Sequence, residues 1–209
     1  MLVTHDTQCA LDALVDLLNT APDVCGHEGL ADLAALHGFV ARSEIVEVAA
    51  LTEADLAAVR RVRTELHAIF RAGTPEAAAQ QVNALVARAG TTPRLTNHDG
   101  HGWHMHYFAP RAALAEHLAA ESGMALAFIV VAGERERLRY CEAPDCARVF
   151  VDLSRNRSRR YCDSRTCGNR LHVAAYRARQ RTMPEQVGSE QVGSAGAAEQ
   201  AAEVTALGA

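Results

Sequence analysis

Four cysteines in one short segment are the residues of this sequence best suited to chemistry. They form two pairs, with four residues inside each pair and fifteen between the pairs. Two such pairs can bring four sulfur atoms to one centre, and Zn²⁺ in closed structural sites is commonly held by four thiolates at about 2.3 Å. The spacing therefore predicts one structural zinc ion per chain, bound by Cys141, Cys146, Cys162 and Cys167.

Other uses of these thiols are disfavoured. Two disulfides would need an oxidising compartment, and the segment from Met1 to Thr7 has no basic stretch followed by an apolar one, so we expect no signal peptide and a cytoplasmic protein. Four thiolates leave zinc no open position for a substrate. A thioredoxin-like pair would have two residues between its cysteines. Four thiols without a common ligand remain the alternative, which the repeated spacing disfavours.

The basic residues surround the cysteines. All 21 are arginine; 13 lie between Glu134 and Arg181 beside six acidic residues, a net +7, while the other eight face 19 acidic residues, a net −11. Because the arginine fork suits phosphate and guanine edges, the basic segment predicts a DNA-facing surface. A solvated basic face, or neutralisation of the zinc site by some of the arginines, is the alternative. The residues predicted to contact nucleic acid are Arg155, Arg157, Arg159, Arg160, Asn169, Arg170, Arg177, Arg179 and Arg181.

The elements that must position this segment begin with helices. Apolar residues recur at helical spacing through the first ninety residues, with polar residues on the opposite faces. The predicted helices run from Cys9 to Thr20, from Glu28 to Phe39 with an end near Gly38, from a capping box at Thr52 to Asp55 onwards, and from Pro75 to a stop at Gly90.

The pattern changes between residues 92 and 108. Two short alternating runs flank a glycine-containing turn, which predicts a β-hairpin. We expect a long helix to follow from Pro110 to about Val131, with a break at Gly123. Its longest apolar run, Met124 to Ala132, is far shorter than the roughly twenty residues that a bilayer needs, so we expect no membrane association.

The hairpin carries four histidines. Side chains alternate along a strand, so two of the four share a face and could chelate a second metal. The alternative, which we favour, is a polar exposed face, because no third ligand is fixed by spacing. The four histidines are His98, His101, His104 and His106.

The fold class that follows is mainly α with one small β-hairpin. We predict an N-terminal helical domain over residues 1–133, with the hairpin near 92–108, and a treble-clef-like four-cysteine zinc finger over residues 134–181. In the finger, a knuckle, a short strand from Arg148 to Val151 and a helix capped by Ser164 would deliver the two cysteine pairs. Residues 182–209 repeat Glu-Gln-Val-Gly-Ser and run on in Ala, Glu and Gln, which predicts a disordered tail.

Several of these residues also form a recognisable signature. The two Cys-x4-Cys pairs, the segment from Asp152 to Arg160 and the run from Cys167 to Arg170, which reads Cys-Gly-Asn-Arg, resemble the CGNR zinc finger of bacteria. That finger closes proteins whose N-terminal part is the ABATE domain, and Asn19-Thr20 is similar to a signature near the start of that domain. The resemblance spans residues 10–181. It implies that the cysteines bind zinc, that the finger contacts DNA, and that the protein is a stress-related transcription regulator.

The sequence thus favours a DNA-binding regulator that is not an enzyme. Its N-terminal domain would sense a small-molecule effector or mediate homodimerisation, and its finger would bind DNA through arginine contacts. One alternative is a protein-interaction module in which zinc only folds the finger. Another is an enzyme that uses the hairpin histidines with a second metal.

Overall fold

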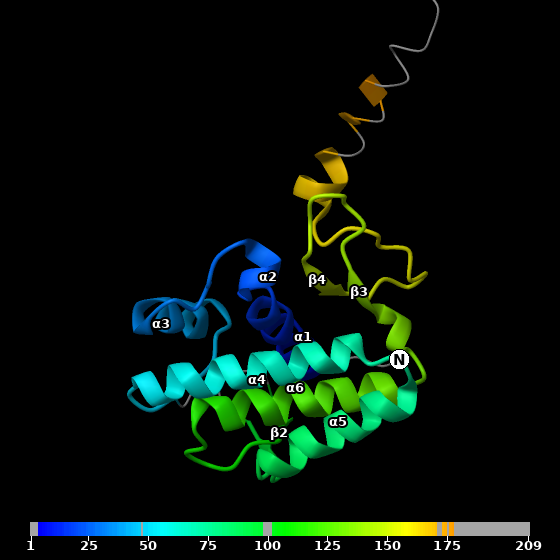
Figure 1. Cartoon of the computed structure of the whole chain (residues 1–209). Helices are drawn as coiled ribbons and strands as arrows, with labels where there is room; N and C mark the ends of the chain where they lie inside the picture. The colour runs from blue at the N-terminus through cyan, green and yellow to red at the C-terminus, as the bar shows by residue number, and fades with distance from the viewer. Residues whose placement is uncertain (1–3, 47, 98–101, 171–172, 175, 178–209) are drawn as a thin grey trace, which may run out of the picture.

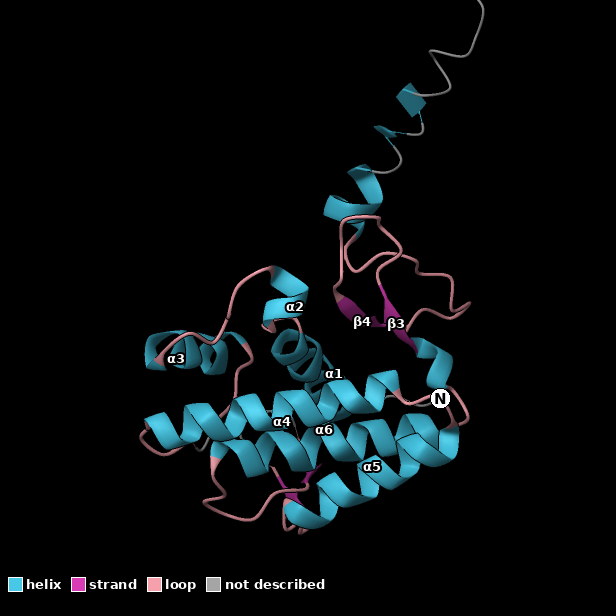
Figure 2. Cartoon of the chain, in the orientation of Figure 1, coloured by secondary structure: helices cyan, strands magenta, loops and turns pink. Residues whose placement is uncertain are grey.

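The computed structural model describes residues 4–46, 48–97, 102–170, 173–174 and 176–177 of the chain. It is mainly helical, as predicted, with two short two-stranded sheets among these residues. A helical body lies below, and a small region that holds the cysteines stands on it (Figure 1). Figure 2 shows that strands occur both beneath the body and at the base of the cysteine region. The helices are α1 (His5–Leu18), α2 (Pro22–Cys25), α3 (Leu33–Arg42), α4 (Glu53–Arg71), α5 (Pro75–Arg88) and α6 (Leu114–Val131).

The starts of α4 and α5 confirm the predictions made from their sequence signals. Thr52 Oγ1 accepts a hydrogen bond from the Asp55 N–H at 3.3 Å, and Asp55 Oδ2 accepts one from the Thr52 N–H at 2.9 Å, which together form the capping box of α4. Helix α5 begins at Pro75, where the missing N–H costs nothing, and the Thr74 hydroxyl accepts from Ala77 N–H at 3.2 Å. Local chemistry alone places these two boundaries.

Helix α3 differs from its prediction. It begins at Leu33 rather than Glu28, because the carboxylate of Asp32 accepts a hydrogen bond from Ala35 N–H at 2.8 Å and caps the helix there. Gly38 lies inside the helix, which ends at Arg42, just before Glu44 takes a positive φ of 51°. The apolar period predicts the helix correctly, whereas both of its ends lie further along the chain than expected.

Helix α6 also begins later than predicted and runs through the middle of the core. Arg111 has a left-handed φ of 63°, so no helix can run from Pro110, and α6 begins at Leu114. Gly123 does not break α6. A Cβ at this position would lie 2.7 Å from Val86 Cγ2, so the glycine allows α5 to pack closely.

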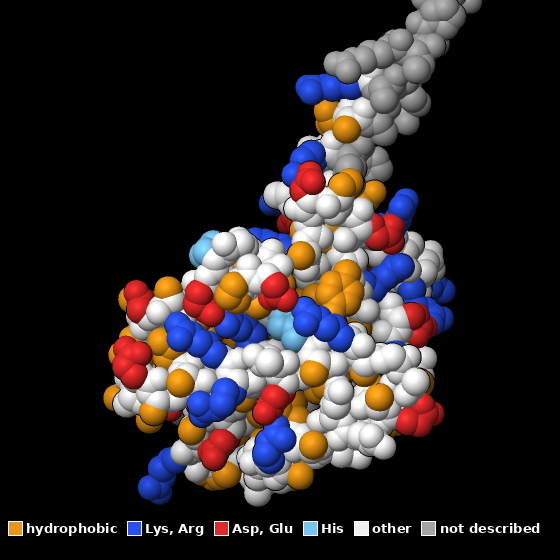
Figure 3. All heavy atoms as spheres, in the orientation of Figure 1, with side chains coloured by type: hydrophobic (Ala, Val, Ile, Leu, Met, Phe, Trp, Pro, Cys, Tyr) orange, Lys and Arg blue, Asp and Glu red, His pale blue; other side chains and the backbone are white. Residues whose placement is uncertain are grey.

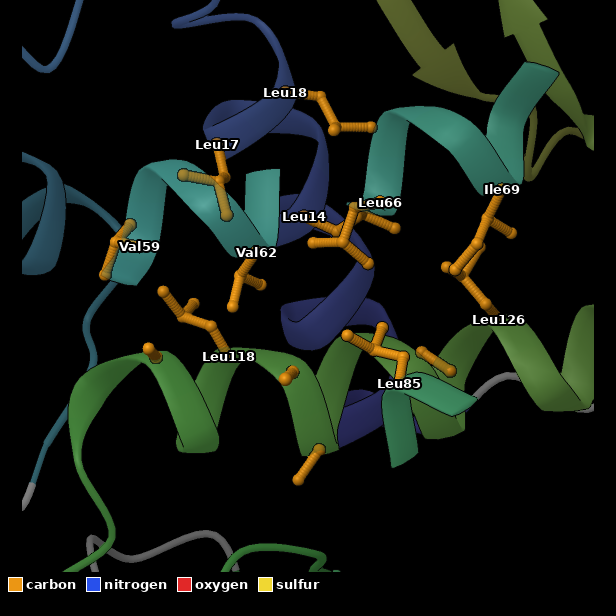
Figure 4. Packing of buried hydrophobic residues seen from close by; sticks show 14 of the residues in the cluster. Leu14, Leu17, Leu18, Val59, Val62, Leu66, Ile69, Leu85, Leu118 and Leu126 are labelled. Atoms are coloured by element: carbon orange, nitrogen blue, oxygen red, sulfur yellow. The ribbon is translucent and has the colours of Figure 1, made fainter. Parts of the chain in front are cut away.

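The hydrophobic core surrounds α6. Figure 4 shows leucines of α1 and the apolar face of α4 directed toward α6, with Leu85 of α5 beside it. By length and composition α6 could cross a membrane, alone among the helices of the described residues, but 56% of it is buried inside the fold. Such burial is typical of a core helix. The labelled members of the core are Leu14, Leu17, Leu18, Val59, Val62, Leu66, Ile69, Leu85, Leu118 and Leu126.

Both sheets are antiparallel. Strand β1 (Arg94–Thr96) pairs with β2 (His104–His106), with Leu95 opposite Met105, and this confirms the predicted hairpin. After a 3₁₀ turn, η1 (Arg135–Arg137), strand β3 (Leu138–Tyr140) pairs with β4 (Val149–Val151). Only the β4 part of this second sheet was predicted. Val149 and Val151 are buried in the same core as α1 and α6, so the sheet joins the cysteine region to the body.

Candidate metal centre and its surroundings

Each cysteine is positioned by a short piece of regular backbone. Cys141 follows β3, and its N–H donates to the Arg148 carbonyl at 2.8 Å; Cys146 closes a tight turn by donating to Ala143 O at 3.1 Å. Cys162 ends the loop that follows β4. Cys167 lies in a π-helical turn, η2 (Ser164–Gly168).

The cap of η2 is Asp163 rather than the predicted Ser164. Its Oδ1 accepts hydrogen bonds from the N–H groups of Arg165 at 2.6 Å and Thr166 at 2.7 Å. A carboxylate satisfies two of the free N–H groups of the turn, which a single hydroxyl one residue later could not do. This capped turn brings Cys167 to the other thiols.

The four thiols form one cluster with the dimensions of a zinc site. All four sulfur atoms lie within 4.8 Å of one another, with Cys146 Sγ 3.7 Å from Cys162 Sγ, and Cys162 Sγ 3.8 Å from Cys167 Sγ. A tetrahedron with Zn–S bonds of about 2.3 Å has edges of about 3.8 Å. The spacing therefore matches tetrahedral coordination, and the cysteines form a site for a single zinc ion, as predicted.

Without a cation, the cluster does not favour four ionised thiols. Burial raises the pKa of the Cys162 thiol, and the sulfurs of Cys146, Cys167 and Cys141 raise it further. At Cys141, burial also acts to raise the pKa, but hydrogen bonds from the N–H groups of Cys162 and Ala143 outweigh it and lower the pKa. Four thiolates this close repel one another, so a divalent ion is what allows all four to ionise.

Asp152 organises the loop between the two cysteine pairs. Its fully buried carboxylate accepts hydrogen bonds from Ser154 N–H at 2.9 Å, Ser154 Oγ at 2.5 Å and Arg159 N–H at 2.8 Å. Arg139 Nη1 lies 3.5 Å from the carboxylate. Burial acts to raise the pKa of Asp152, yet these hydrogen bonds and Arg139 outweigh it and lower the pKa. The loop is therefore built around an ionised aspartate.

Three of the predicted DNA-contacting arginines have partners within the finger. Arg157 pairs with Glu136, and Arg160 Nε lies 2.6 Å from Glu142 Oε2. Arg159 donates to the carbonyls of Tyr161 and Cys162, and its guanidinium lies over the Phe150 ring at 4.9 Å. These three side chains hold the loop and the third cysteine in place.

The other predicted contact residues are exposed. Arg155, Asn169, Arg170 and Arg177 are all on the surface, as is Arg165 in η2. None of their side chains has a hydrogen bond or ion pair with any part of the chain that the structure describes. On the face shown in Figure 3, basic side chains are spread around the finger with acidic ones between them. Arg179 and Arg181 lie outside the described residues, as does the tail predicted over residues 182–209.

The hairpin histidines do share a face, as predicted. His104 Nε2 lies 3.0 Å from His106 Nε2, while His98 and His101 lie outside the described residues. Among the described residues, the four cysteines are the only group of three or more donors arranged to hold a metal. A second metal site at His104 and His106 stays a hypothesis, because no third ligand joins them among the described residues.

Asn19, which belongs to the N-terminal signature, has a structural role that the sequence pattern does not reveal. Its Nδ2 donates to the Val149 carbonyl at 3.0 Å, and its Oδ1 accepts from the Val149 N–H at 2.9 Å. The neighbouring Thr20 hydroxyl accepts from Arg63 Nη1 at 2.9 Å. The two residues therefore connect α1 to the finger on one side and to α4 on the other.

A helical body joined to a four-cysteine metal site on a small antiparallel sheet defines a zinc-finger protein with an N-terminal helical domain. Comparison with protein families gives the same division. Residues 11–133 match the ABATE domain, whose description reads "Putative stress-induced transcription regulator", and residues 137–180 match the CGNR zinc finger. The chain belongs to the ABATE family and carries a CGNR zinc finger at its C-terminal side. No curated protein matches the chain.

Proposed function

We propose that this protein is a DNA-binding transcription regulator in which the zinc finger contacts DNA. The observation that carries the proposal is the group of exposed side chains without partners in the described part of the chain: Arg155, Asn169, Arg170 and Arg177. An arginine already paired with a carboxylate must break that pair before it can bind phosphate, whereas an unpaired one binds at no such cost. Zinc fixes Cys167 in η2, and two of these residues, Asn169 and Arg170, directly follow this turn.

This assignment divides the predicted contact residues into two groups. Arg157 and Arg160 are paired with carboxylates and Arg159 donates to carbonyls, so we expect these three to contribute less to DNA affinity than the unpaired arginines. Arg155, Arg170 and Arg177 are available to phosphate oxygens, and Asn169 can reach a base edge. In Figure 1, η2 lies at the end of the cysteine region that is away from the helical body.

The proposal includes no catalytic activity, because four cysteine ligands complete the tetrahedron and leave the zinc ion no open position. The N-terminal domain is proposed to sense a small-molecule effector or to mediate homodimerisation. A regulator of this kind would act in the cytoplasm.

Two double variants with the same change in charge test the proposal. Arg155→Ala with Arg170→Ala removes two unpaired arginines, and Arg157→Ala with Arg160→Ala removes two that are paired with Glu136 and Glu142. Binding to a library of genomic DNA fragments is measured at two salt concentrations, and zinc content is measured for each variant. Removing one arginine that binds a DNA phosphate should reduce the slope of log affinity against log salt by about 0.9.

We expect the first variant to show a slope reduced by about two units and to keep its zinc, and the second to show a reduction of less than one unit. Equal reductions in the two variants would show that only net charge matters. Retention of every fragment to the same extent, or of none, would favour the protein-interaction module instead.

A further inference from the structure

A pocket lies on the helical body, on the side of the hairpin. Its volume is about 540 Å³, and it is bounded by the first turns of α1, by the hairpin and by the middle of α6. Pockets that bind small molecules typically measure about 300–1,000 Å³ and are mainly apolar with a few convergent polar groups. The size and position suit a small ligand held between three elements.

One wall of the pocket is aromatic and exposed. The Trp103 side chain is 74% exposed and Phe128 is 39% exposed, although both are large apolar groups. Tyr107 lies edge-to-face with Phe128, with ring centroids 6.2 Å apart. Large apolar side chains left open to water around one cavity indicate a surface that a ligand covers.

The pocket has two carboxylates among its polar groups. Glu121 and Asp6 line it together with His5 and His104, and no arginine does. Within the described residues Glu121 makes one hydrogen bond, in which Oε1 accepts from Tyr107 N–H at 3.0 Å. The second carboxylate oxygen is left for a ligand.

An adjoining pocket of about 420 Å³ strengthens the negative field. It shares Glu121 and Asp6 with the first and adds three more acidic side chains against one arginine. The surroundings of Glu121 thus carry an excess of negative charge beside aromatic rings. The added residues are Asp12, Asp16, Glu44 and Arg42.

These acidic and partly apolar surroundings raise the pKa of Glu121. Burial raises its pKa to about 7, and Asp6 raises it as well, while the Tyr107 N–H, His104 and Arg94 lower it. A bound cation would favour the ionised carboxylate and reverse the effect of burial.

We propose that this pocket binds a small organic cation with an apolar or aromatic body, whose charge lies against Glu121 and Asp6 and whose body packs on Trp103. Rings attract cations through their faces, and this attraction grows where water is excluded. A carboxylate at the end of an aromatic wall therefore selects positive over neutral or negative ligands of the same shape. The proposal rests on the proposed function in that it names the effector class and the site through which the N-terminal domain would sense it.

Trp103 provides the measurement, because it is the only tryptophan in the chain. The full-length zinc-loaded protein is titrated with benzyltrimethylammonium while tryptophan fluorescence is followed, and phenylacetate and benzyl alcohol serve as anionic and neutral comparators. We expect a saturable change with the cation and at least tenfold weaker binding of the other two. Equal affinity for all three, or no saturation with the cation, would overturn the proposal.

Two variants with the same change in charge test the role of the carboxylate. Glu121→Gln keeps an oxygen that can accept from Tyr107 N–H but removes the charge, and Glu76→Gln removes an exposed charge at the start of α5, away from the pocket. We expect at least tenfold weaker cation binding in the first and unchanged binding in the second. Asp6→Asn, expected to weaken binding by a smaller factor, provides a second test if Glu121→Gln alters the fold.

The charge of the probe does not change with pH, so any pH dependence belongs to the protein. Affinity should rise with pH through about 7 as Glu121 ionises, and this rise should be absent in Glu121→Gln. An unchanged pH profile in that variant would assign the effect to other groups and contradict contact with the carboxylate.

DNA affinity is measured in parallel, with and without the cation. Cation binding without any effect on DNA would leave the pocket established and refute its sensory role. DNA binding without cation binding would leave the regulator established and refute the pocket.

Discussion

Asn19 at the end of α1 and Val149 in β4 are joined by two hydrogen bonds, one through each end of the Asn19 carboxamide. Arg148 and Asp152 pair through the main chain with the β3 side of the sheet, so Val149 directs its own N–H and C=O to the opposite edge. The carboxamide there supplies both the donor and the acceptor that a neighbouring strand would supply. The Asn19 side chain, at the end of the first helix of the ABATE domain, thus takes the place of a third strand at this edge of the zinc-finger sheet.

Replacing Asn19 should loosen the finger from the helical body. Asn19→Ala leaves two partly buried main-chain groups of Val149 without partners, which should cost about 2–4 kcal/mol of unfolding free energy. Urea unfolding measures the cost, and hydrogen exchange at the Val149 amide locates it. Asn83→Ala, at an exposed position of α5, should cost less than about 0.5 kcal/mol. Equal costs in the two variants would contradict a specific link.

A partly buried ion pair fixes the loop before α3. Arg63 Nη1 lies 2.6 Å from Glu28 Oε1, and Arg63 Nη2 lies 2.7 Å from Glu28 Oε2, with the Arg63 side chain only 7% exposed. Glu28→Ala would leave this guanidinium without its carboxylate, which should cost about 3 kcal/mol. The pair Arg88 with Glu65 is about half exposed, so Glu65→Ala should cost less than about 1 kcal/mol. Chemical unfolding of the two variants measures both costs, and equal values would contradict the role of burial.

The same ion pair gives a pH dependence of known sign. The hydrogen bonds from Arg63 lower the pKa of Glu28, so its contribution to stability is present above the unfolded-state pKa of about 4.3 and is lost as pH falls through the folded-state pKa. In Glu28→Ala this loss should be missing from the acid limb of the stability curve. An acid limb identical to that of the native chain would assign the effect to other carboxyls.

His117 and Glu121, one turn apart on α6, should oppose each other on acidification. Burial, His106 and Arg94 lower the pKa of His117 to about 4, so between about pH 6.5 and 4 only the unfolded chain takes up this proton, and stability falls by up to about 3 kcal/mol. The pKa of Glu121 is about 7, so the folded chain takes up its proton first and stability rises as pH falls toward about 4.5.

Variants separate these two contributions. Chemical unfolding of His117→Phe, which can keep the stacking on Phe108, should show stability that rises as the pH falls from about 7 to about 4.5. Glu121→Gln should show stability that falls more steeply than in the native chain over the same range. If stability instead rose with falling pH in Glu121→Gln and fell in His117→Phe, the pKa shifts assigned to His117 and Glu121 would be wrong.

Removal of zinc should unfold the finger and spare most of the body. The apolar cluster around the cysteines adds only Ala143 and Tyr161 among the described residues, whereas α4, α5 and α6 pack against one another around Gly123 and Leu126. Chelation, or Cys162→Ser, should raise hydrogen exchange in β3 and β4 while the amides of α6 stay protected. Loss of the helical signal in circular dichroism would show instead that the body depends on the metal.

The zinc site could be predicted from sequence because its ligands lie in two short segments and spacing limits their geometry. The capping box at Thr52 was predictable for the same reason, since donor and acceptor are three residues apart. The roles of the arginines were not, because Arg157 meets Glu136 only after β3 and β4 have paired. A charge count along the chain cannot distinguish a paired arginine from an unpaired one.

Only part of the pocket could be predicted from the sequence. Glu121 interrupts the apolar stripe of α6 between Leu118 and Ala125, and a carboxylate at such a position is a signal of a buried site. Its partners come from α1 and the hairpin, about a hundred residues apart in the chain, so no local pattern assembles them. Asn19 likewise belonged to a known signature, but its contact with Val149 spans 130 residues.

That separation also bears on how the chain is made. Helix α1 is synthesised before α6 and β4, yet its apolar face packs against α6, and Asn19, which caps its end, binds β4. Contacts distant in sequence close slowly and leave apolar surface open in the meantime. Helix α1 is therefore fully buried only after these later elements have been made, and a nascent chain that stops before residue 149 carries α1 without the strand that completes its contacts.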